Sequence, residues 1–191
     1  MASDRLGLWH LVGIAVLSRE SMSEFVPLRI AVLTVSDSRT EATDKSGRLL
    51  GERIHAAGHV LYEKRICADD VYELRAIVSR WIADAAPDAV ITTGGTGLTG
   101  RDITPQALQV LFDRHIDGFG EMFRMLSYAD IGTSTLQSRA VAGVAKATFI
   151  FCLPGSTGAC ADGWDRLIAE QLDGRTRPCN LPELLPRLME R

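Results

Sequence analysis

The residues in this sequence best suited to phosphate chemistry lie in ITTGGTGLTGRDITPQAL, residues 91–108. Glycines without a Cβ allow several backbone N–H groups to converge on one oxyanion, and a helix start adds a partial positive charge. The pattern predicts such a start at Thr104 and Pro105, an N-cap threonine followed by an N1 proline. The other interpretation is a tight turn that needs glycine. The candidate ligand-binding residues here are Thr93, Gly94, Gly95, Thr96, Gly97 and Arg101.

An aspartate, Asp102, follows the glycines, and a bare carboxylate beside phosphate costs energy unless a cation lies between them. Mg²⁺ is typically held by one or two protein carboxylates together with water and substrate phosphate oxygens. A second carboxylate should come from another strand end, and Asp69-Asp70 directly follows the run that ends at Cys67. At least one of these two aspartates is also expected to cap the helix that begins at Val71. The pattern leaves Asp69 open between a metal or catalytic role and a cap.

Two familiar phosphate motifs do not fit this segment. Gly95 to Asp102 has the outer spacing of the P-loop, but Arg101 stands in place of the lysine and Asp102 in place of the magnesium-binding hydroxyl. The letters G-x-G-x-x-G occur at residues 95–100, but they follow the third strand candidate and the helix begins late for a dinucleotide-binding turn. Neither a P-loop nor a nicotinamide site is therefore expected.

The elements that position these residues are short apolar runs alternating with helical patterns, which is typical of an α/β fold with a largely parallel sheet. In open sheets of this kind the ligand crevice lies beyond the carboxyl ends of the strands. The segments after Val35, Cys67 and Thr93 are therefore the predicted functional loops. The expected strands are residues 28–35, 59–67 and 88–93, and the expected helices are 46–58 and 71–85.

Length and composition indicate a globular chain with one core. The chain has 191 residues, 46% hydrophobic and 24% charged, so we expect a single domain over residues 24–191. With 21 basic and 24 acidic residues, the formal net charge is −3. That balance gives no broad basic field, so small-molecule substrates are favoured over nucleic acid or an anionic membrane as partners.

Residues 1–23 are expected to form an extension ahead of this domain. The segment LGLWHLVGIAVLS, residues 6–18, has the length of a signal-peptide apolar region, but it is too short to span a bilayer and no clean cleavage site follows. Met22 is an alternative start, which would make the preceding residues an upstream extension. A targeting role is the other interpretation.

The cysteines and histidines give no metal or disulfide pattern. The four cysteines lie far apart without a C-x-x-C pair, which is typical of reduced thiols in a cytoplasmic protein. The four histidines are isolated in the sequence, so they are expected to be surface or satisfied interior residues.

Five blocks of the sequence resemble molybdenum cofactor biosynthesis proteins of the MoaB/MogA type, which share a domain with plant and animal molybdopterin adenylyltransferases. The resemblance covers roughly residues 24–181, and LQSRAVAG and GRTRPCN are more similar to the MoaB branch. It implies a three-layer α/β/α fold with a mostly parallel, mixed central sheet. The blocks are LTVSDSR (33–39), TTGGTGLTGRDITPQAL (92–108), DGFGEMFRMLS (117–127), GTSTLQSRAVAGV (132–144) and FCLPGST (151–157).

The resemblance implies adenylyl transfer from Mg-ATP to the terminal phosphate of molybdopterin, with release of pyrophosphate. The family needs two acidic residues for this transfer, and by motif they correspond to Asp69 and Asp102, as catalytic residues and Mg²⁺ ligands. Some MoaB-type proteins have little such activity, so a catalytically weak pterin-binding or scaffold homologue is the alternative. Family members form trimers, the MoaB branch often pairs trimers into hexamers, and other molybdenum cofactor enzymes are further candidate partners.

Other candidate contacts follow by motif. Ser36 and Asp37, after the first strand, resemble part of a nucleotide- or pterin-binding loop, as do Asp44 and Lys45 at the first helix. Lys45 and Arg101 are available as phosphate clamps, whereas Asp44 can instead cap the helix. A strand-to-helix turn can present hydroxyl and N–H groups to the pterin, or can be a glycine turn with an N-cap. Its residues are Pro154, Gly155, Ser156 and Thr157.

Three further features of the sequence allow more than one interpretation. Arg139 can meet a phosphate or pair with a carboxylate across a subunit contact. The Phe and Met side chains within residues 119–125 are expected in the core or in an oligomer contact. Ala68 precedes Asp69 where the family commonly has a proline, so the placement of that carboxylate is less defined.

Overall fold

The computed structural model describes residues 24–190, in which six strands form one sheet in the order β2-β1-β3-β6-β5-β4. The expected N-terminal extension and the alternative start at Met22 lie outside the described residues. Strands β2, β1, β3 and β6 run parallel to one another, whereas β5 and β4 are antiparallel to their neighbours. The strands are β1 (Arg29–Val35), β2 (Val60–Cys67), β3 (Ala89–Thr93), β4 (Arg114–His115), β5 (Val141–Ala145) and β6 (Thr148–Leu153).

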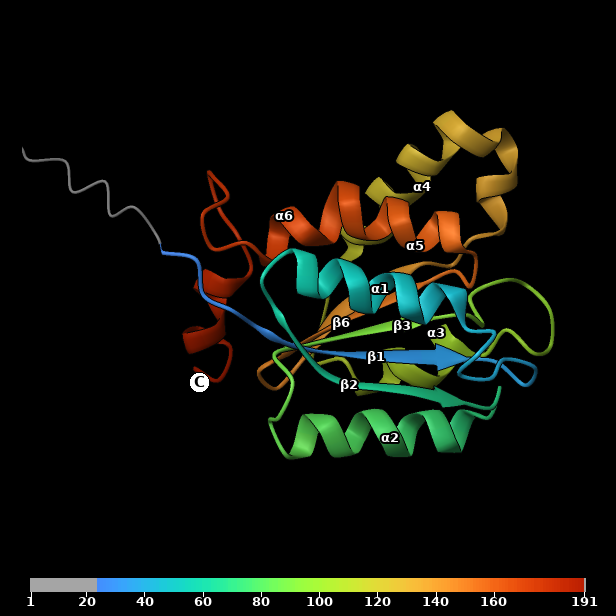
Figure 1. Cartoon of the computed structure of the whole chain (residues 1–191), viewed down its shortest axis with the longest axis horizontal. Coiled ribbons are helices and arrows are strands. Elements are labelled where there is room, and N and C mark those ends of the chain that lie inside the picture. Colours follow the sequence, from blue (N-terminus) through green and yellow to red (C-terminus); the bar gives the residue numbers. More distant parts are fainter. Residues whose placement is uncertain (1–23, 191) are drawn as a thin grey trace, which may run out of the picture.

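Helices cover both faces of the sheet, which gives the three-layer α/β/α arrangement that the resemblance implies. In Figure 1, α1, α5 and α6 lie on one side of the strands and α2 lies on the other, while α4 rises beyond the sheet. The helices are α1 (Lys45–Ala56), α2 (Val71–Ala83), α3 (Thr104–Leu108), α4 (Asp117–Ile131), α5 (Thr157–Gly163) and α6 (Ala169–Leu172). Shorter turns are η1 (Gln109–Leu111), η2 (Gly132–Gln137), η3 (Trp164–Ile168) and η4 (Pro182–Arg187).

Side chains of the central strands alternate between two hydrophobic cores. In β1, Ile30 and Val32 pack with α1 and α5 on one face, whereas Leu33 and Val35 pack with α2 and α3 on the other. Successive residues of a strand point to opposite faces, and both faces are covered, so a continuous apolar run is required. This explains why β1 reads as LRIAVLTV rather than as an alternating pattern.

The predicted order of strands and helices is confirmed, with small differences at the ends. Strands β1, β2 and β3 agree with the expected ranges within one residue. Helix α1 begins one residue earlier than expected and ends two residues earlier, and α2 also ends two residues earlier. Two residues after its end, each of these two helices has a residue with left-handed backbone, Gly58 at φ 84° after α1 and Ala85 at φ 48° after α2. A positive φ cannot continue a right-handed helix, which accounts for both early ends.

The predicted N-cap at Thr104 is wrong. Ile103 occupies the N-cap of α3 without a side-chain hydrogen bond, so Thr104 and Pro105 are the first two helical residues. The Thr104 hydroxyl is buried and donates to the Gly94 carbonyl at 2.8 Å. The threonine therefore fastens the glycine loop to the helix, a tertiary contact that local sequence does not reveal.

The aromatic and methionine residues of α4 separate into two groups. Phe119 and Phe123 are buried in the core, whereas Met122 and Met125 are exposed on the outer side of the helix. The core prediction holds for the phenylalanines only.

The lengths of the helices and the state of the cysteines bear on the expectations from composition. None of the helices in residues 24–190 is long and apolar enough to cross a membrane. The four cysteines are free, and Cys67, Cys152 and Cys160 are buried. Burial raises the pKa of the Cys67 and Cys152 thiols to about 12 and that of Cys160 to about 11, so these three thiols stay protonated and unreactive at neutral pH.

The core packing leads to a stability prediction. Phe149 in β6 is fully buried, whereas Tyr72 on α2 is 78% exposed. Phe149→Ala should lower the free energy of unfolding by about 3–5 kcal/mol because it leaves a cavity, whereas Tyr72→Ala should change it by less than about 0.5 kcal/mol. Urea denaturation followed by circular dichroism measures both. Equal losses for the two variants would contradict the assignment of the core.

Candidate functional site

Four parallel strands deliver their carboxyl ends to one edge of the sheet, and the loops that follow them lie together there (Figure 1). Backbone hydrogen bonds extend past the strands themselves. The N–H of Ser36 donates to the Cys67 carbonyl at 2.9 Å, and the N–H of Gly94 donates to the Leu153 carbonyl at 3.0 Å. The predicted loops after β1, β2 and β3 are therefore brought together, and the loop after β6 joins them.

Two glycines at the end of β3 cannot be replaced without strain. Gly94 has φ 107° and Gly95 has φ 64°, a backbone region that glycine adopts readily and other residues rarely adopt. A Cβ at Gly94 would lie 2.3 Å from the Val35 carbonyl oxygen of the neighbouring strand. Glycine here allows the loop to pass directly over the end of β1.

The carbonyl groups of the glycine loop accept hydrogen bonds from Thr104 and Arg139. Thr104 bonds the Gly94 carbonyl through its hydroxyl and the Gly95 carbonyl through its N–H, at 2.8 and 2.9 Å. The N–H of Arg139 donates to the Thr96 carbonyl at 3.0 Å, and its Nε donates to the Gly97 carbonyl at 2.6 Å.

The loop N–H groups differ in how they are used. Gly94 N–H is bonded to β6, but within residues 24–190 the N–H groups of Gly95 and Thr96 have no hydrogen-bond partner. Both are available to an anion. Arg139 has a structural role that the sequence did not indicate. Its guanidinium orders the loop, donating to the Gly97 and Asp102 carbonyls from the segment just before β5.

Asp102 closes the same loop through its carboxylate. Oδ2 accepts hydrogen bonds from the Thr99 N–H at 2.8 Å and the Thr99 hydroxyl at 2.7 Å. Partial burial acts to raise the pKa of Asp102, but the bonds from Thr99, the Gly97 N–H and the charge of Arg139 outweigh it and lower the pKa. Asp102 is therefore ionised at neutral pH and fixed in orientation.

Asp69 lies opposite, in the loop after β2, and is fixed by Asp37. Its Oδ2 accepts from the Asp37 N–H at 3.2 Å, and its own N–H donates to Asp37 Oδ1 at 3.0 Å. Partial burial raises the pKa of Asp69, and the charges of Asp37 and Asp102 add to this, although the Asp37 N–H and Arg101 act in the opposite direction. The crowded carboxylates make this corner of the site attractive to a cation.

The cap at the start of α2 is Asp70 and not Asp69. Asp70 Oδ1 accepts from the Tyr72 and Glu73 N–H groups, both at 2.8 Å. The ambiguity in the Asp69-Asp70 pair is thus resolved, because Asp70 satisfies the helix end and Asp69 faces the loops of β1 and β3.

Two cavities flank the glycine loop and meet at Gly94 and Gly155. The larger, of about 400 Å³, is bounded by the glycine loop with Asp102, by the turn after β6 and by α4 and η2. The smaller, of about 220 Å³, is bounded by the ends of β1 and β3 and by the start of α1. The smaller cavity is polar, lined by Thr34, Ser36, Ser38, Arg39, Asp44 and Ser46.

Some of the remaining predicted residues line the cavities or cap the helices beside them, and others do neither. Asp44 is buried, caps α1 by accepting from the Gly47 N–H at 2.8 Å, and also bonds the Thr34 hydroxyl at 2.9 Å. Ser156 lines the larger cavity and caps α5. Lys45 and Thr157 are exposed first residues of α1 and α5 and border neither cavity.

Thr93 and Pro154 link the strand ends to each other. The Thr93 hydroxyl is buried, donates to the Pro154 carbonyl at 3.0 Å and lies 3.0 Å from Cys160 Sγ. Pro154 also lines the larger cavity beside Gly155.

One wall of the larger cavity was not predicted. Helix α4, turn η2 and the residue that follows it contribute Phe123, Ser127, Ile131, Ser134, Gln137 and Ser138. Their motif resembles the family, but residues that lie well beyond the glycine loop in sequence give no local signal that they fold back over it. Thr99 was also missed, because a threonine in a loop has no distinguishing pattern.

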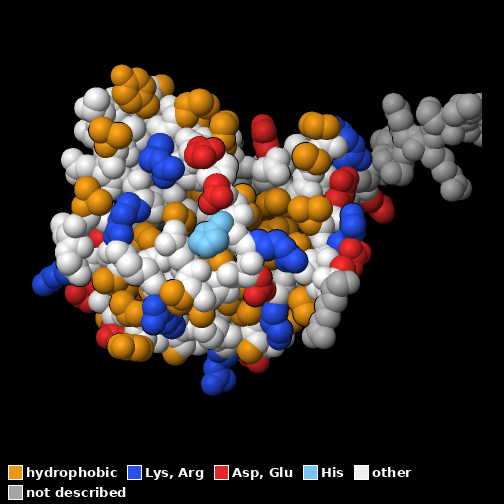
Figure 2. All heavy atoms as spheres, turned by 180° about the vertical axis from the view of Figure 1, so that it is seen from behind, with side chains coloured by type: hydrophobic (Ala, Val, Ile, Leu, Met, Phe, Trp, Pro, Cys, Tyr) orange, Lys and Arg blue, Asp and Glu red, His pale blue; other side chains and the backbone are white. Residues whose placement is uncertain are grey.

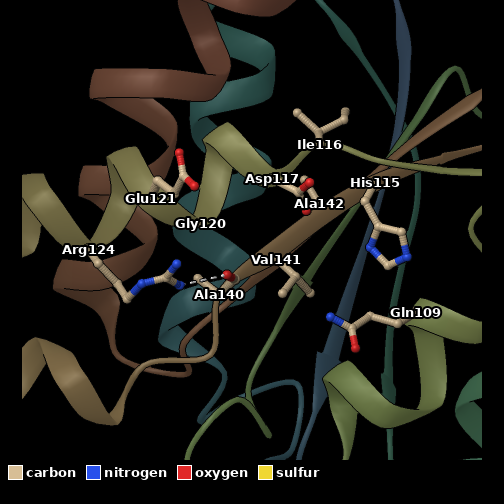
Figure 3. Close-up of a pocket in the computed structure, with 10 residues that line it drawn as sticks. All are labelled: Gln109, His115, Ile116, Asp117, Gly120, Glu121, Arg124, Ala140, Val141 and Ala142. Carbon is tan, nitrogen blue, oxygen red and sulfur yellow. Dashed lines mark hydrogen bonds between the residues drawn. The ribbon is translucent and has the colours of Figure 1, made fainter.

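A separate polar pocket of about 230 Å³ lies at the outer edge of β5 and contains none of the predicted site residues (Figure 3). In Figure 3, Arg124 on α4 points to the Ala140 carbonyl, which accepts its hydrogen bond at 3.3 Å, while His115 and Gln109 lie on the other side. The pocket combines acidic and basic side chains, Asp117, Glu121, His115 and Arg124.

The residues present fit a cation shared with a substrate better than a resident, fully enclosed metal. Within residues 24–190 no group of three or more His, Cys, Asp or Glu side chains is placed to hold a metal ion. The hydrogen bonds from Asp37 to the Asp69 carboxylate and from Thr99 to the Asp102 carboxylate are all made to Oδ2, so both carboxylates retain lone pairs for a ligand. Mg²⁺ bound by one or two carboxylates and completed by phosphate oxygens needs no more than this.

Comparison with known proteins shows a family for this chain. Residues 31–174 match the family described as "Probable molybdopterin binding domain". Molybdenum cofactor biosynthesis protein B of Escherichia coli (strain K12) is 57% identical over 158 residues, which cover 83% of this chain and 93% of that protein.

Solved structures are similar over most of the chain. A crystal structure of molybdenum cofactor biosynthesis protein B superposes with a TM-score of 0.78 at 38% identity and covers 87% of this chain and 98% of its own. The tungsten cofactor synthesizing protein MoaB from Pyrococcus furiosus gives a TM-score of 0.70 at 33% identity, with 86% and 98% covered.

The loop geometry predicts how the site responds to loss of Arg139. Arg139→Ala removes the charged hydrogen bonds to the Gly97 and Asp102 carbonyls, each worth about 1.5–3 kcal/mol, so amide exchange across residues 94–102 should become about 10–100-fold faster. Hydrogen-exchange mass spectrometry measures this. Arg187→Ala, which removes an exposed guanidinium at the other end of the chain, is the control. Unchanged exchange in the Arg139 variant would show that the loop is ordered by other contacts.

Proposed function

The chain belongs to the family of molybdopterin-binding domains that includes molybdenum cofactor biosynthesis protein B, and we propose that it acts in the synthesis of the molybdenum cofactor by transferring the adenylyl group of ATP to molybdopterin. The observation that supports this proposal is a glycine loop, with N–H groups at Gly95 and Thr96 that are unbonded within residues 24–190, beside two oriented carboxylates, Asp69 and Asp102. Such a pairing suits a Mg²⁺-bound triphosphate.

The reaction requires alignment and charge neutralisation rather than a base. An oxygen of the terminal phosphate of molybdopterin attacks the α-phosphorus of ATP, a new P–O–P link forms, and the α–β bridging bond breaks with its electron pair leaving on pyrophosphate. The attacking phosphate is already an oxyanion, so no proton has to be removed. The free N–H groups of Gly95 and Thr96 are placed to bind phosphate oxygens.

The two carboxylates have a defined part in this scheme. Asp102, whose carboxylate is oriented by Thr99, would hold Mg²⁺ against the phosphates. Asp69 would be the second ligand or would orient a bound water. When bound, Mg²⁺ would neutralise charge on the triphosphate and on the leaving pyrophosphate. Arg101 on the same loop is 81% exposed and can reach a phosphate from solvent.

The two cavities give the two substrates a shared boundary. They meet at Gly94 and Gly155, beside the loop that carries Asp102. Two ligands placed on either side of that boundary would bring their phosphates together, which is the proximity that a transfer between bound substrates needs.

We also propose that the chain assembles as a homotrimer, with a pair of trimers as the larger form, through α4 and η2. Exposed apolar side chains gather on these two elements, in the upper-left region of Figure 2. A solvated monomer has little reason to expose so many large apolar side chains on one protruding helix. They are Met122, Met125, Tyr128, Ile131 and Leu136.

We place the protein in the cytoplasm. Its four cysteines are unpaired, and unpaired thiols suit a reducing compartment.

Substitution of the two carboxylates tests the proposed chemistry. Asp102→Asn and Asp69→Asn should each reduce pyrophosphate release from molybdopterin, ATP and Mg²⁺ on the order of 100-fold or more, because a neutral amide cannot balance the cation. Asp70→Asn is the matched control. It stands beside Asp69 but caps α2, and asparagine caps as well as aspartate, so activity should be retained.

The same assay separates the two candidate functions. Binding of molybdopterin to the Asp102 variant without turnover would support a catalytic carboxylate. Unchanged turnover in that variant would remove Asp102 from the mechanism. A wild-type protein that binds molybdopterin but releases no pyrophosphate would instead be the pterin-binding or scaffold homologue.

Charged substitutions on α4 test the assembly. Met125→Glu with Tyr128→Glu should convert the trimer to monomer, because charges buried in an apolar contact are costly. Size-exclusion chromatography with light scattering measures the mass. Tyr72→Glu, an exposed aromatic on α2, should leave the trimer intact. A double variant that remains trimeric would place the contact elsewhere.

A further inference from the structure

We propose that Asp37 is a positioning residue for Asp69 and does not itself bind substrate or cation. This inference rests on the proposed function and assigns to Asp37 a role different from the ligand contact that its motif suggests. Asp37 follows β1 and Asp69 follows β2, so the two lie 32 positions apart in the chain and meet only in the fold.

The contact between the two aspartates is reciprocal. The N–H of Asp37 donates to Asp69 Oδ2 at 3.2 Å, and the N–H of Asp69 donates to Asp37 Oδ1 at 3.0 Å. Each carboxylate thus binds the backbone of the other residue. A backbone N–H bonded to a carboxylate is a charge-assisted hydrogen bond, so the pair fixes both the main chain at Asp69 and the orientation of its side chain.

The parallel sheet continues into this contact. The N–H of Ser36 donates to the Cys67 carbonyl at 2.9 Å, one residue before the aspartate pair. The three successive bonds join the loops after β1 and β2 into one unit. Without the two bonds between Asp37 and Asp69, the main chain at Asp69 would be preceded only by Ala68, an exposed residue whose side chain cannot fix its orientation.

The two carboxylate oxygens of Asp37 face protein groups, one in a hydrogen bond and the other at ion-pair distance. Oδ1 accepts from the Asp69 N–H, and Oδ2 lies 3.7 Å from Arg101 Nη1 on the glycine loop. Asp37 therefore contacts the loops of β2 and β3 from the end of β1. Asp69 differs, because its hydrogen bond is made through Oδ2 and Oδ1 is left for a ligand.

The hydrogen bonds of Asp37 give a specific substitution test. Asp37→Asn keeps an oxygen that can accept from the Asp69 N–H but removes the charge, whereas Asp37→Ala removes the acceptor. Asp37→Ala should raise the Mg²⁺ concentration for half-maximal activity about 10-fold and lower kcat about 10–100-fold, since a misplaced ligand loses alignment. Asp37→Asn should restore both values to within about 3-fold of wild type. Glu41→Ala is the control. It removes a carboxylate from the same loop, where the Glu41 side chain is 74% exposed, and should behave as wild type.

A second-site change tests the positioning role directly. Proline at position 68 restricts its own φ and favours an extended residue before it, and Cys67 is already the last residue of a strand. If Asp37 acts by holding the main chain at Asp69, Asp37→Ala combined with Ala68→Pro should recover at least about a third of the lost kcat. Proline cannot replace a missing charge.

Binding of Mn²⁺ together with ATP, measured by electron paramagnetic resonance, distinguishes failure of this inference from failure of the proposed function. Weaker Mn²⁺ binding in Asp37→Ala and recovery in Asp37→Asn would support positioning even if no transfer occurs in wild type. An Asp37→Asn variant as impaired as Asp37→Ala, with no recovery by proline, would overturn the inference, because the charge of Asp37 would then act directly. Wild-type protein that binds no Mn²⁺ with ATP would overturn both.

Discussion

The site depends on the repulsion between fixed carboxylates beside a loop that is suited to bind phosphate. Asp102 is ionised and oriented by Thr99, and Asp69 is held opposite it by Asp37. Partial burial is the main cause of the raised pKa of Asp69, and the negative charges of Asp37 and Asp102 add to it, so a cation beside these carboxylates would be stabilising. This arrangement of carboxylates beside the glycine loop is the basis for the proposal of a Mg²⁺-bound triphosphate.

The fold supplies this arrangement through the directions of its strands. Because β1, β2 and β3 are parallel and adjacent, their loops meet without any contact in sequence. The tertiary hydrogen bonds then fix each loop to its neighbour. Asp37 joins the loops of β1 and β2, while Thr104 and Arg139 hold the carbonyl side of the glycine loop. The N–H groups of the loop are thereby left to bind an anion. Glycine allows the backbone conformation of the loop, but the bonds to its carbonyl groups decide which way the N–H groups point.

Sequence patterns were sufficient for β1, β2, β3, α1, α2 and the glycine loop, because those features depend on local periodicity and on backbone freedom. They could not assign Asp69 and Asp70, since either can cap a helix and only the folded loops show which one does so. The N-cap prediction at Thr104 was wrong, and the role of Arg139 in ordering the loop was not foreseen, because each side chain bonds carbonyl groups that are distant in the chain. The wall formed by α4 and η2 depends on a long-range return of the chain that no spacing encodes.

The central claim is that a divalent cation links the two fixed carboxylates to an incoming nucleotide. A crystal structure with Mn²⁺ and a non-hydrolysable ATP analogue, with Mn²⁺ located by anomalous scattering, tests it most directly. The metal peak should lie within about 2.5 Å of a carboxylate oxygen of Asp102, with the α-phosphate next to the Gly95 N–H. A nucleotide and metal bound elsewhere, with the glycine loop vacant, would contradict the account.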